Sequence, residues 1–446
     1  MDTINSQAES KQGHAPTRGY MSHDRYRWYV VGMLWSVAFF DYADRLGIFS
    51  VFPLLEKEMH LSPVQLGLLG SVFAWVYGLG APFAGYVVDR IRRKTAIISG
   101  LFTWSLVTVA ATLSRSFRHL FSFMVTEAVS EAIYIPACMS MLSDYHGKAT
   151  RSRALGVLQT SVYMGTIGGG FLAGLIAQHY GWRWSFVVLG GAGIVLAAIL
   201  LVVLREPQRG AAEREDGSLD ARDPALARVS AGQSLKLILG TPSAVMLMGC
   251  FMCANFVALV LLSWMPKFLY DKYHLSLAMA GLTATLFAQV ASMVGAPIGG
   301  WLADILAKRL VGGRVVVQAV AIFCGVPFVF LWGQAGSIRW VIFALAAWGL
   351  FKGLYDANSF AAIFDVVPPQ VRGTAAGFLN MTGFLGGGAA PVIVGFMVQR
   401  IGISWAISLA STVFLAGGVL LVIALTGFIR RDVMRVQEFV KAQHAP

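Results

Sequence analysis

Long apolar runs separated by short charged segments dominate this chain. Six such runs precede residue 205 and six more follow residue 239. Runs of about 20 apolar residues match the roughly 30 Å hydrocarbon core of a bilayer, because an α-helix rises about 1.5 Å per residue. The pattern therefore predicts twelve membrane-spanning helices, near 28–54, 63–88, 94–113, 118–144, 152–178, 183–204, 241–270, 277–305, 314–334, 338–366, 373–399 and 403–429.

One long segment between these runs is too polar to lie in lipid. Residues 205–239 are charged and rich in Ala, Arg and Asp, which is typical of a linker. The sequence thus predicts an all-α membrane protein with two six-helix bundles, at 28–204 and 240–429, joined by this linker. The polar tails are 1–27 and 430–446.

Composition and charge agree with a membrane protein. The 446 residues are 57% apolar and 13% charged, with a mean hydropathy of +0.65, whereas soluble domains carry roughly 25% charged residues. A net charge of +12 raises the alternative of nucleic-acid binding, so the positions of the basic residues are decisive. Of the 35 Lys and Arg residues, 25 lie on the side of the tails and linker and 8 on the opposite side.

That bias is typical of cytoplasmic loops, and it explains the basic excess without nucleic acid. We expect a multi-pass protein of the cell membrane with both termini in the cytoplasm. The basic loops are also expected to meet anionic lipid headgroups.

The two halves of the chain repeat two motifs. GYVVDR at residues 85–90, after the second span, recurs as GWLAD at 300–304 after the eighth span. RSRALGVLQ at 151–159, opening the fifth span, matches RGTAAGFLN at 372–380, opening the eleventh. Two repeated halves predict a pseudo-symmetric duplication of the kind that transporters use for alternating access.

These motifs resemble the major facilitator superfamily over essentially the whole chain. GYVVDRIRRK at 85–94 is similar to its signature between the second and third spans, with Arg92 in place of the usual second glycine. The segment EAIYIP at 131–136 is similar to two groups, the anion:cation symporters of organic anions and the spinster-like lipid transporters. Both groups usually carry an arginine seven residues before Glu131, and this chain has Met124 there. The resemblance implies a monomeric secondary transporter.

Seven charged residues lie within predicted spans, where an ionised side chain costs several kcal/mol and therefore usually has a function. They are Asp41, Asp44, Arg45, Glu127, Glu131, Lys352 and Asp356. Spacings of three or four residues predict that Asp41 pairs with Arg45, that Glu127 and Glu131 share one face, and that Lys352 pairs with Asp356. Since all seven ionised would sum to −3, at least one carboxyl group is expected to be protonated in part of a transport cycle.

The resemblance favours Glu131 as the proton-coupling residue, with Asp44 as its partner and Glu127 in support. Alternatively, Asp44 and Arg45 form a static ion pair, and Glu127 is solvated near the outer face. Lys352 and Asp356 either neutralise each other or contact substrate. All eight histidines lie in tails, loops or the ends of spans, so a histidine relay is not expected.

Polar and aromatic residues within the spans are the candidates for contacting substrate, although each alternatively bonds a neighbouring helix. They are Asp41, Arg45, Tyr77, Tyr134, Gln159, Tyr163, Asn255, Gln289, Lys352, Tyr355, Asp356, Asn358 and Asn380. With two cationic groups among them, they favour an organic anion.

A latch is implied by the resemblance at the cytoplasmic end of the second span. There, Asp89 would face the positive N-terminus of the eleventh span and hold the outward-open state, an interaction of about 0.3 to 2 kcal/mol. The latch residues are Gly85, Asp89, Arg90, Arg93, Asp144 and Arg151. Alternatively, these charges only set the topology.

The leading interpretation is an H⁺-coupled symporter of a small organic anion, such as a sugar acid or carboxylate. Alternatives are a spinster-like carrier of lysolipid or another amphipath, and a membrane sensor or scaffold that moves no solute. An enzyme is not expected, because the chain has no GxxxxGK[ST] loop and no cytoplasmic segment large enough for a catalytic domain. No cofactor or metal site is expected, and the CxxC of Cys250 and Cys253 is interpreted as packing.

Overall fold

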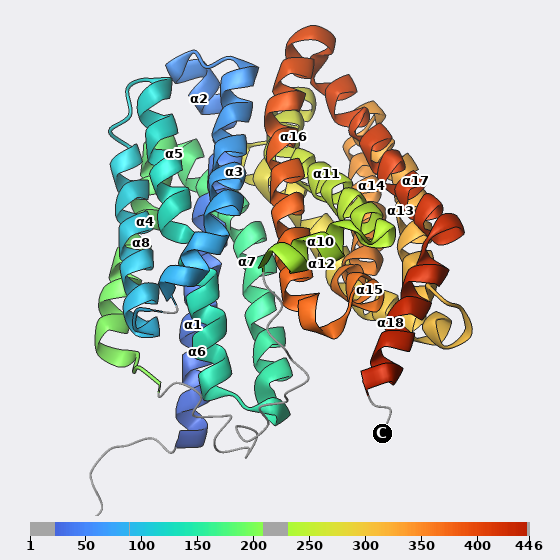
Figure 1. Cartoon of the computed structure of the whole chain (residues 1–446). Coiled ribbons are helices and arrows are strands. Elements are labelled where there is room, and N and C mark those ends of the chain that lie inside the picture. Colours follow the sequence, from blue (N-terminus) through green and yellow to red (C-terminus); the bar gives the residue numbers. More distant parts are fainter. Residues whose placement is uncertain (1–22, 89, 208–230, 444–446) are drawn as a thin grey trace, which may run out of the picture.

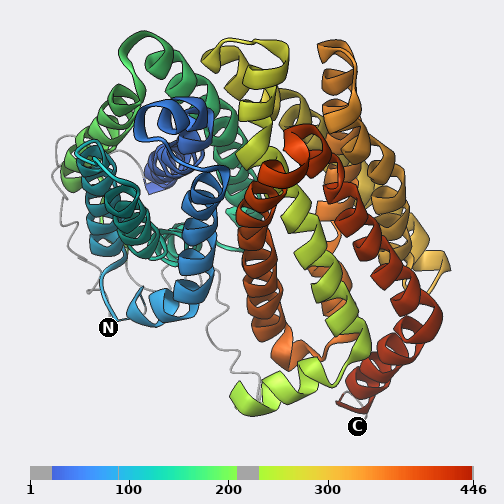
Figure 2. The same ribbon diagram turned by 90° about the horizontal axis from the view of Figure 1, so that it is seen from above.

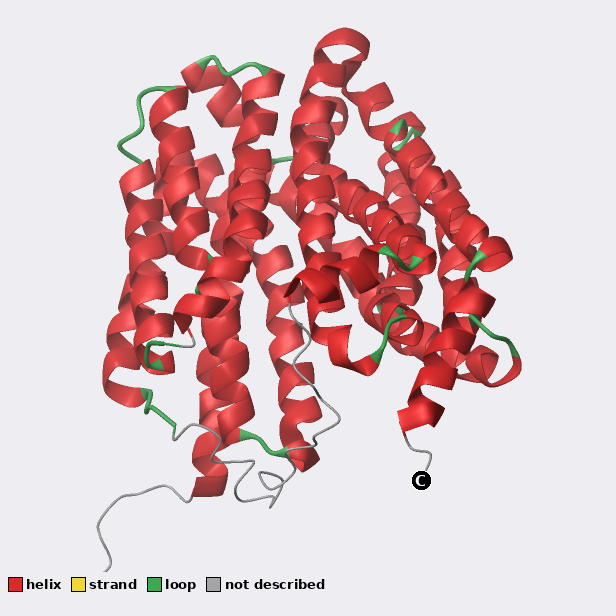
Figure 3. Ribbon diagram, viewed as in Figure 1, coloured by secondary structure: helices red, strands yellow, loops and turns green. Residues whose placement is uncertain are grey.

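The structure, a computed structural model, describes residues 23–88, 90–207 and 231–443. All regular secondary structure in these ranges is helical (Figure 3). The helices form two bundles that stand side by side in the side view of Figure 1 and in the view from above in Figure 2. The predicted all-α fold of two bundles is therefore confirmed.

The first bundle contains α1 (His23–Ser50), α2 (Phe52–Met59), α3 (Pro63–Val88), α4 (Arg93–Ala111), α5 (Phe117–Glu131), α6 (Tyr134–Tyr145), α7 (Lys148–Tyr180) and α8 (Trp182–Val203). A capping box starts α3: the Ser62 hydroxyl accepts from the Gln65 N–H at 3.3 Å, and the Gln65 side chain accepts from the Ser62 N–H at 2.9 Å. Pro63, which has no N–H to leave unpaired, is the first helical residue.

The second bundle contains α10 (Ala231–Leu239), α11 (Pro242–Tyr273), α12 (Leu277–Arg309), α13 (Gly313–Gln334), α14 (Ile338–Asp356), α15 (Ser359–Val366), the 3₁₀ turn η2 (Pro369–Val371), α16 (Arg372–Ser408), α17 (Ala410–Gly427) and α18 (Ile429–Gln443). Helix α10 lies within the predicted linker, and α18 lies within the predicted C-terminal tail. Gly402, with φ of +79°, turns the chain inside α16, so this element holds the eleventh span and the start of the twelfth.

Eleven helical segments of the described ranges are long and apolar enough to cross a membrane. The remaining predicted span, the first in the chain, corresponds to α1, whose 28 residues extend about 42 Å. Asp41, Asp44 and Arg45 make α1 less apolar than the other spans. Three of the seven charged candidate residues thus lie on the span that hydropathy identifies least well.

Two spans are broken at equivalent places in the two bundles. The fourth predicted span consists of α5 and α6, and Glu131 is the last residue of α5. The tenth consists of α14 and α15, and Asp356 is the last residue of α14. Each charged side chain therefore lies where a helix is interrupted and backbone carbonyl groups lose their helical partners.

The bundles meet closely at the end of the molecule that carries α2, which we name the α2 end. There α3 packs on α16 and α7 packs on α12. A side chain added at Gly67 would collide with the backbone of Pro391, and one added at Gly281 would collide with the backbone of Gly170. Small residues of this kind let helices approach to backbone contact within a membrane.

A buried lysine ties the two bundles together at the α2 end. Lys267 of α11 is 6% exposed, and its Nζ donates to Glu56 of α2 at 2.5 Å and to Asp271 at 2.7 Å. Nearby, the Trp264 indole donates to the Pro391 carbonyl at 3.0 Å within the second bundle. Lys267 therefore bonds both bundles, while its charge is shielded from water.

Four hydrogen bonds between described residues join the bundles in the half nearer the α2 end. They are Lys267 to Glu56, Lys57 to Tyr270, Trp75 to the Leu385 carbonyl, and the Val392 N–H to Ser71. The opposite end, where α3 ends and α7 and α16 begin, is named the linker end.

Replacing Lys267 by Met is expected to shift the protein toward a form that is open at the α2 end, because the bond from α11 to Glu56 is lost. Spin labels on the exposed residues Arg118 and Arg339, one on each bundle, should report a population at longer distance by double electron–electron resonance. Lys272→Met is the matched control, because Lys272 donates only to the carbonyls of Gly333 and Ala335 within its own bundle. An unchanged distance distribution in Lys267→Met would show that the bridge does not hold this end closed.

Candidate functional site

A cavity of about 510 Å³ lies between the two bundles, and we name it the central cavity. Helices α1 and α7 line it from the first bundle, and α11, α12, α14, α15 and α17 line it from the second. Eight of the predicted substrate residues line it: Arg45, Gln159, Tyr163, Asn255, Gln289, Lys352, Tyr355 and Asp356. The volume is in the range of small-molecule sites, which are clefts of about 300 to 1,000 Å³.

Several other predicted substrate residues bond neighbouring helices instead. Tyr134 is fully buried, and its hydroxyl donates to the Leu34 carbonyl at 2.8 Å. The Asn358 amide donates to the carbonyls of Gly299 at 3.2 Å and Leu354 at 3.0 Å. Asn380 is exposed on α16 and is not among the lining residues. For Tyr134 and Asn358, the alternative of a helix-to-helix bond is the correct one.

Arg45 is held by aromatic faces rather than by a carboxylate. Its guanidinium carbon lies 4.5 Å from the ring centroid of Phe73, 5.4 Å from Tyr77, 5.5 Å from Tyr42 and 5.6 Å from Phe384. These distances are typical of cation–π contacts. Phe384 belongs to α16 of the second bundle, so the guanidinium lies at the seam between the bundles.

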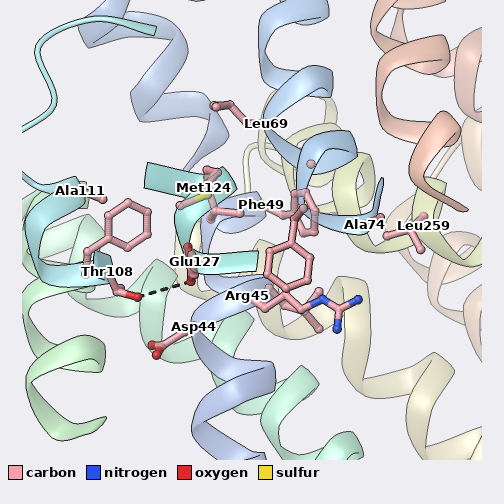
Figure 4. Close-up of a pocket in the computed structure, with 15 residues that line it drawn as sticks. Asp44, Arg45, Phe49, Leu69, Ala74, Thr108, Ala111, Met124, Glu127 and Leu259 are labelled. Atoms are coloured by element: carbon pink, nitrogen blue, oxygen red, sulfur yellow. Dashed lines mark hydrogen bonds between the residues drawn. The ribbon is translucent and has the colours of Figure 1, made fainter. Parts of the chain in front are cut away.

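The expected ion pairs of Arg45 are not formed among the described residues. Asp44 is its neighbour in sequence, and consecutive side chains on a helix diverge by about 100°. Figure 4 shows Arg45 extending away from Asp44. The predicted ion pair with Asp41 is also wrong, because no such pair is formed and the Asp41 carboxyl group instead lies close to that of Glu131 on α5. Arg45 therefore has no carboxylate partner within the described chain.

The four carboxyl groups of the first bundle are all buried. Asp41, Asp44, Glu127 and Glu131 are 2%, 4%, 3% and 1% exposed. The alternative that Glu127 is solvated is therefore wrong, and the Thr108 hydroxyl lies 3.4 Å from its Oε1. The carboxyl groups of Asp41 and Glu131 lie close together, so ionising both would place two like charges in one buried site.

A second, smaller cavity of about 20 Å³ is lined mainly by the first bundle, with Leu259 of α11 from the second, and we name it the bundle cavity (Figure 4). Asp44, Arg45, Thr108 and Glu127 line it together with apolar side chains. Met124, the position at which the chain departs from both similar groups, also lines it. The sequence departure thus falls beside the buried carboxyl groups.

Lys352 and Asp356 form the predicted ion pair on the central cavity. Their side chains are 23% and 40% exposed, so the pair faces open space rather than packed protein. Tyr163, from the opposite bundle, lines the same cavity. The pair leaves the second bundle's side of the cavity close to electrically neutral.

Part of the predicted charge network at the linker end is present. Arg93 bonds Asp144 at 2.7 Å, and Arg151 donates to the carbonyls of His146 and Ser143. Burial lowers the pKa of His146, which keeps this imidazole neutral at pH 7. Arg90 is exposed, Gly85 lies in the last turns of α3, and Asp89 lies outside the described residues.

Four residues that surround the buried charges are not among the predicted site residues: Tyr42, Phe73, Thr108 and Phe384. For Tyr42 a signal existed, because it lies three residues before Arg45 on the same helical face. Phe73 and Tyr77 are likewise one turn apart, and their rings stack at 6.0 Å. Thr108 and Phe384 carried no signal, because only folding brings them to α1 and α5.

Two helical bundles that span a membrane and share one polar cavity at their interface define a solute carrier. A sequence profile of the Major Facilitator Superfamily matches residues 34–308 and 268–446. The chain belongs to this superfamily, and it is a membrane transporter rather than an enzyme.

Relatives of two kinds are similar over most of the chain. The Probable galactarate/D-glucarate transporter GudP of Escherichia coli (strain K12) is 26% identical over 400 residues, which cover 84% of this chain and 88% of the relative. Protein spinster of Drosophila melanogaster is 26% identical over 391 residues, covering 84% of this chain and 63% of the relative. A solved bacterial homolog of the human lysosomal transporter Spinster, inward-facing and unoccupied, has a TM-score of 0.76 at 22% identity and covers 95% of this chain and 99% of its own.

Tyr134→Phe is expected to lower the free energy of unfolding by about 1 kcal/mol, because the buried Leu34 carbonyl loses its donor. Substrate affinity should not change, since Tyr134 lies outside the central cavity. Tyr163→Phe is the matched variant. It should weaken substrate binding and leave the Tm unchanged. Thermal unfolding of the purified protein and ligand titration would measure both quantities. Weaker binding in Tyr134→Phe at unchanged Tm would place its hydroxyl in the substrate site.

Proposed function

We propose that this protein is an H⁺-coupled symporter of a small organic anion, of which a sugar acid is the leading example. The observation that carries the proposal is the guanidinium of Arg45, which lines the central cavity without a carboxylate partner in the described chain. A buried cation of this kind is stabilised when a ligand supplies the anion. Arg45 also presents a fork of N–H donors that matches a carboxylate.

The rest of the central cavity suits a hydroxylated ligand. Gln159, Asn255 and Gln289 line it from both bundles, and their amides offer donors and acceptors to sugar hydroxyl groups. The name of the galactarate/D-glucarate relative supports a sugar acid. A substrate that bonds Arg45 on one side and the amides of α11 and α12 on the other would bridge the two bundles.

Coupling to protons would use the longer-range attraction between Arg45 and the carboxyl groups of Asp41 and Glu131, with which it forms no ion pair. When a substrate carboxylate binds Arg45, the guanidinium stabilises the ionised form of those carboxyl groups less, so proton binding becomes more favourable. Linkage makes the effect reciprocal, and protonation strengthens anion binding by the same factor. In this mechanism Glu131 carries the coupling proton, and Asp44 and Glu127 set the field around it.

Alternating access would move the two bundles, 28–204 and 240–429, as bodies joined by the linker at 205–239. The basic bias supports cytoplasmic termini in the cell membrane, which makes the α2 end external and the present state inward-facing. In the opposite state Gly85, Asp89, Arg90, Arg93, Asp144 and Arg151 would form the latch against the start of α16. We expect a monomer to complete this cycle.

A second candidate is transport of a lysolipid or another amphipath. Phe251, Phe360 and Phe414 line the central cavity and give an aliphatic chain an apolar surface. The similarity to Protein spinster points the same way. The two candidates differ in their need for Arg45, because only the small anion depends mainly on a charge-assisted bond.

The decisive experiment uses purified protein in liposomes that hold a pH-sensitive dye, at zero membrane potential. Sugar acids, monocarboxylates, dicarboxylates and lysolipids are added outside in turn. One anion is expected to acidify the lumen. Glu131→Gln should reduce this signal to that of empty liposomes, and Arg45→Gln should weaken anion binding about 10- to 100-fold, as expected for loss of a hydrogen bond to a charged group.

Glu438→Gln, which removes an exposed carboxylate on α18, is the matched control and should transport normally. Lysolipid movement without a pH change for any anion would assign the protein to the second candidate. A protein that binds an anion but moves neither anion nor lipid would be a sensor.

A further inference from the structure

The bundle cavity holds acidic chemistry that substrate binding in the central cavity does not use. Its volume of about 20 Å³ is enough for one water-sized particle, which needs about 10 to 15 Å³. Its lining residues with side-chain oxygens, Asp44, Thr108 and Glu127, are 4%, 2% and 3% exposed, and Arg45 also lines it. Any occupant is therefore small, and it exchanges most of its hydration shell for protein oxygens.

Asp44 is the least satisfied of these residues. Neither of its carboxylate oxygens has a hydrogen-bond partner, and both are inaccessible to solvent. An ionised carboxylate that is buried without a partner costs several kcal/mol, so native proteins pair such groups with a cation or an ion. In Figure 4, Asp44 lies beneath the Thr108–Glu127 contact on the same side of the cavity.

Thr108 and Glu127 add further oxygens. The Thr108 Oγ1 lies 3.0 Å from the Trp104 carbonyl and 3.4 Å from Glu127 Oε1. A hydroxyl has one proton, so it can donate fully to only one of them, and it keeps lone pairs for another contact. The shorter distance favours the carbonyl, which leaves Glu127 with a weak donor at best.

The protein's own nearby cation does not neutralise these two carboxyl groups. The guanidinium of Arg45 extends away from Asp44 into the faces of Phe73 and Tyr77, at 4.5 Å and 5.4 Å. Asp41 and Glu131 lie close to each other, and neither makes a hydrogen bond to Asp44. Asp44 and Glu127 therefore form an acidic site with unused oxygens and with space between helices α1, α4 and α5.

We propose that the bundle cavity binds one sodium-sized monovalent cation through the carboxylates of Asp44 and Glu127 and the hydroxyl of Thr108. A proton on Asp44 would satisfy one oxygen and would still need an acceptor, whereas a cation contacts all three residues at once. A divalent ion is disfavoured, because such ions prefer more carboxylate ligands and the described residues contain no cluster of three or more acidic, His or Cys side chains. Bound there, the cation joins α1, which carries Arg45, to α4 and α5.

The test measures cation binding in detergent without any substrate, so it does not depend on the proposed transport activity. The Tm of the full chain is followed in NaCl, KCl and choline chloride at one ionic strength and one pH. Na⁺ is expected to raise the Tm saturably over choline, because a ligand that binds only the folded state stabilises it. K⁺, which is larger, should have a smaller effect.

Variants at the three ligands sharpen the test. Asp44→Asn and Glu127→Gln should abolish the Na⁺ shift, and since they remove a buried charge, they should not lower the Tm in choline. Thr108→Val should weaken Na⁺ binding about tenfold. Met124→Leu, which changes an apolar lining residue at nearly constant volume, is the matched control and should keep the full shift.

Three results would overturn the proposal. They are the same Tm in Na⁺ and in choline for the wild type, a full Na⁺-induced Tm shift in Asp44→Asn, or a Tm that changes with pH but not with Na⁺. Sugar-acid binding in choline, measured in the same preparation, reports on the central cavity. Its presence or absence tests the proposed function independently of the cation.

Discussion

Four buried carboxyl groups near one guanidinium are the constraint on which the rest of this structure depends. Each ion within a bilayer costs several kcal/mol unless something compensates its charge. Arg45 sits on aromatic faces that tolerate a cation without neutralising it. Asp41 and Glu131 lie close to each other, and the carboxylate oxygens of Asp44 have no hydrogen-bond partner. The first bundle therefore carries buried charge that its own described side chains do not balance.

The second bundle is built on the opposite principle. Its charged residues on the central cavity, Lys352 and Asp356, pair with each other and need nothing further. Both bundles nevertheless end a half-helix at a charged residue, Glu131 in one and Asp356 in the other. The two bundles thus share the position of the helix break but differ in how their buried charges are balanced. The first bundle holds the unbalanced charge, and the second supplies a neutral wall with amides and aromatic rings.

The sequence predicted the fold well because lipid imposes simple rules on it. Helix length and turn chemistry repeat in every span, and the charge pattern then divides the chain into halves. The break after Glu131 has a sequence signal in Pro136, whose ring displaces the carbonyl of Ala132 four residues earlier, whereas the break after Asp356 has no proline near it. The boundary between the eleventh and twelfth spans near Gly402 is also hard to predict, because one helix continues directly into the next.

The site was predicted less completely, because spacing along one helix cannot show which way neighbouring helices turn a side chain. Asp41 and Arg45 have the right spacing to pair, yet Glu131 from another helix reaches Asp41 instead. Lys352 and Asp356 do pair, since no closer partner intervenes. Tyr134 has the polar, aromatic character expected of a substrate residue, but its hydroxyl donates to a backbone carbonyl of a neighbouring helix. Contacts between distant segments decided each case.

The glycine contacts at the α2 end have an evolutionary consequence. Gly67 and Gly281 line neither cavity, but their backbones meet the other bundle directly, so even an alanine there would push the bundles apart at the α2 end. Residues of the central cavity such as Gln159 and Asn255 have open space in front of them. Substitutions in the central cavity can therefore change which solute fits during evolution. The positions of Gly67 and Gly281, where the two bundles touch, accept nothing larger than glycine.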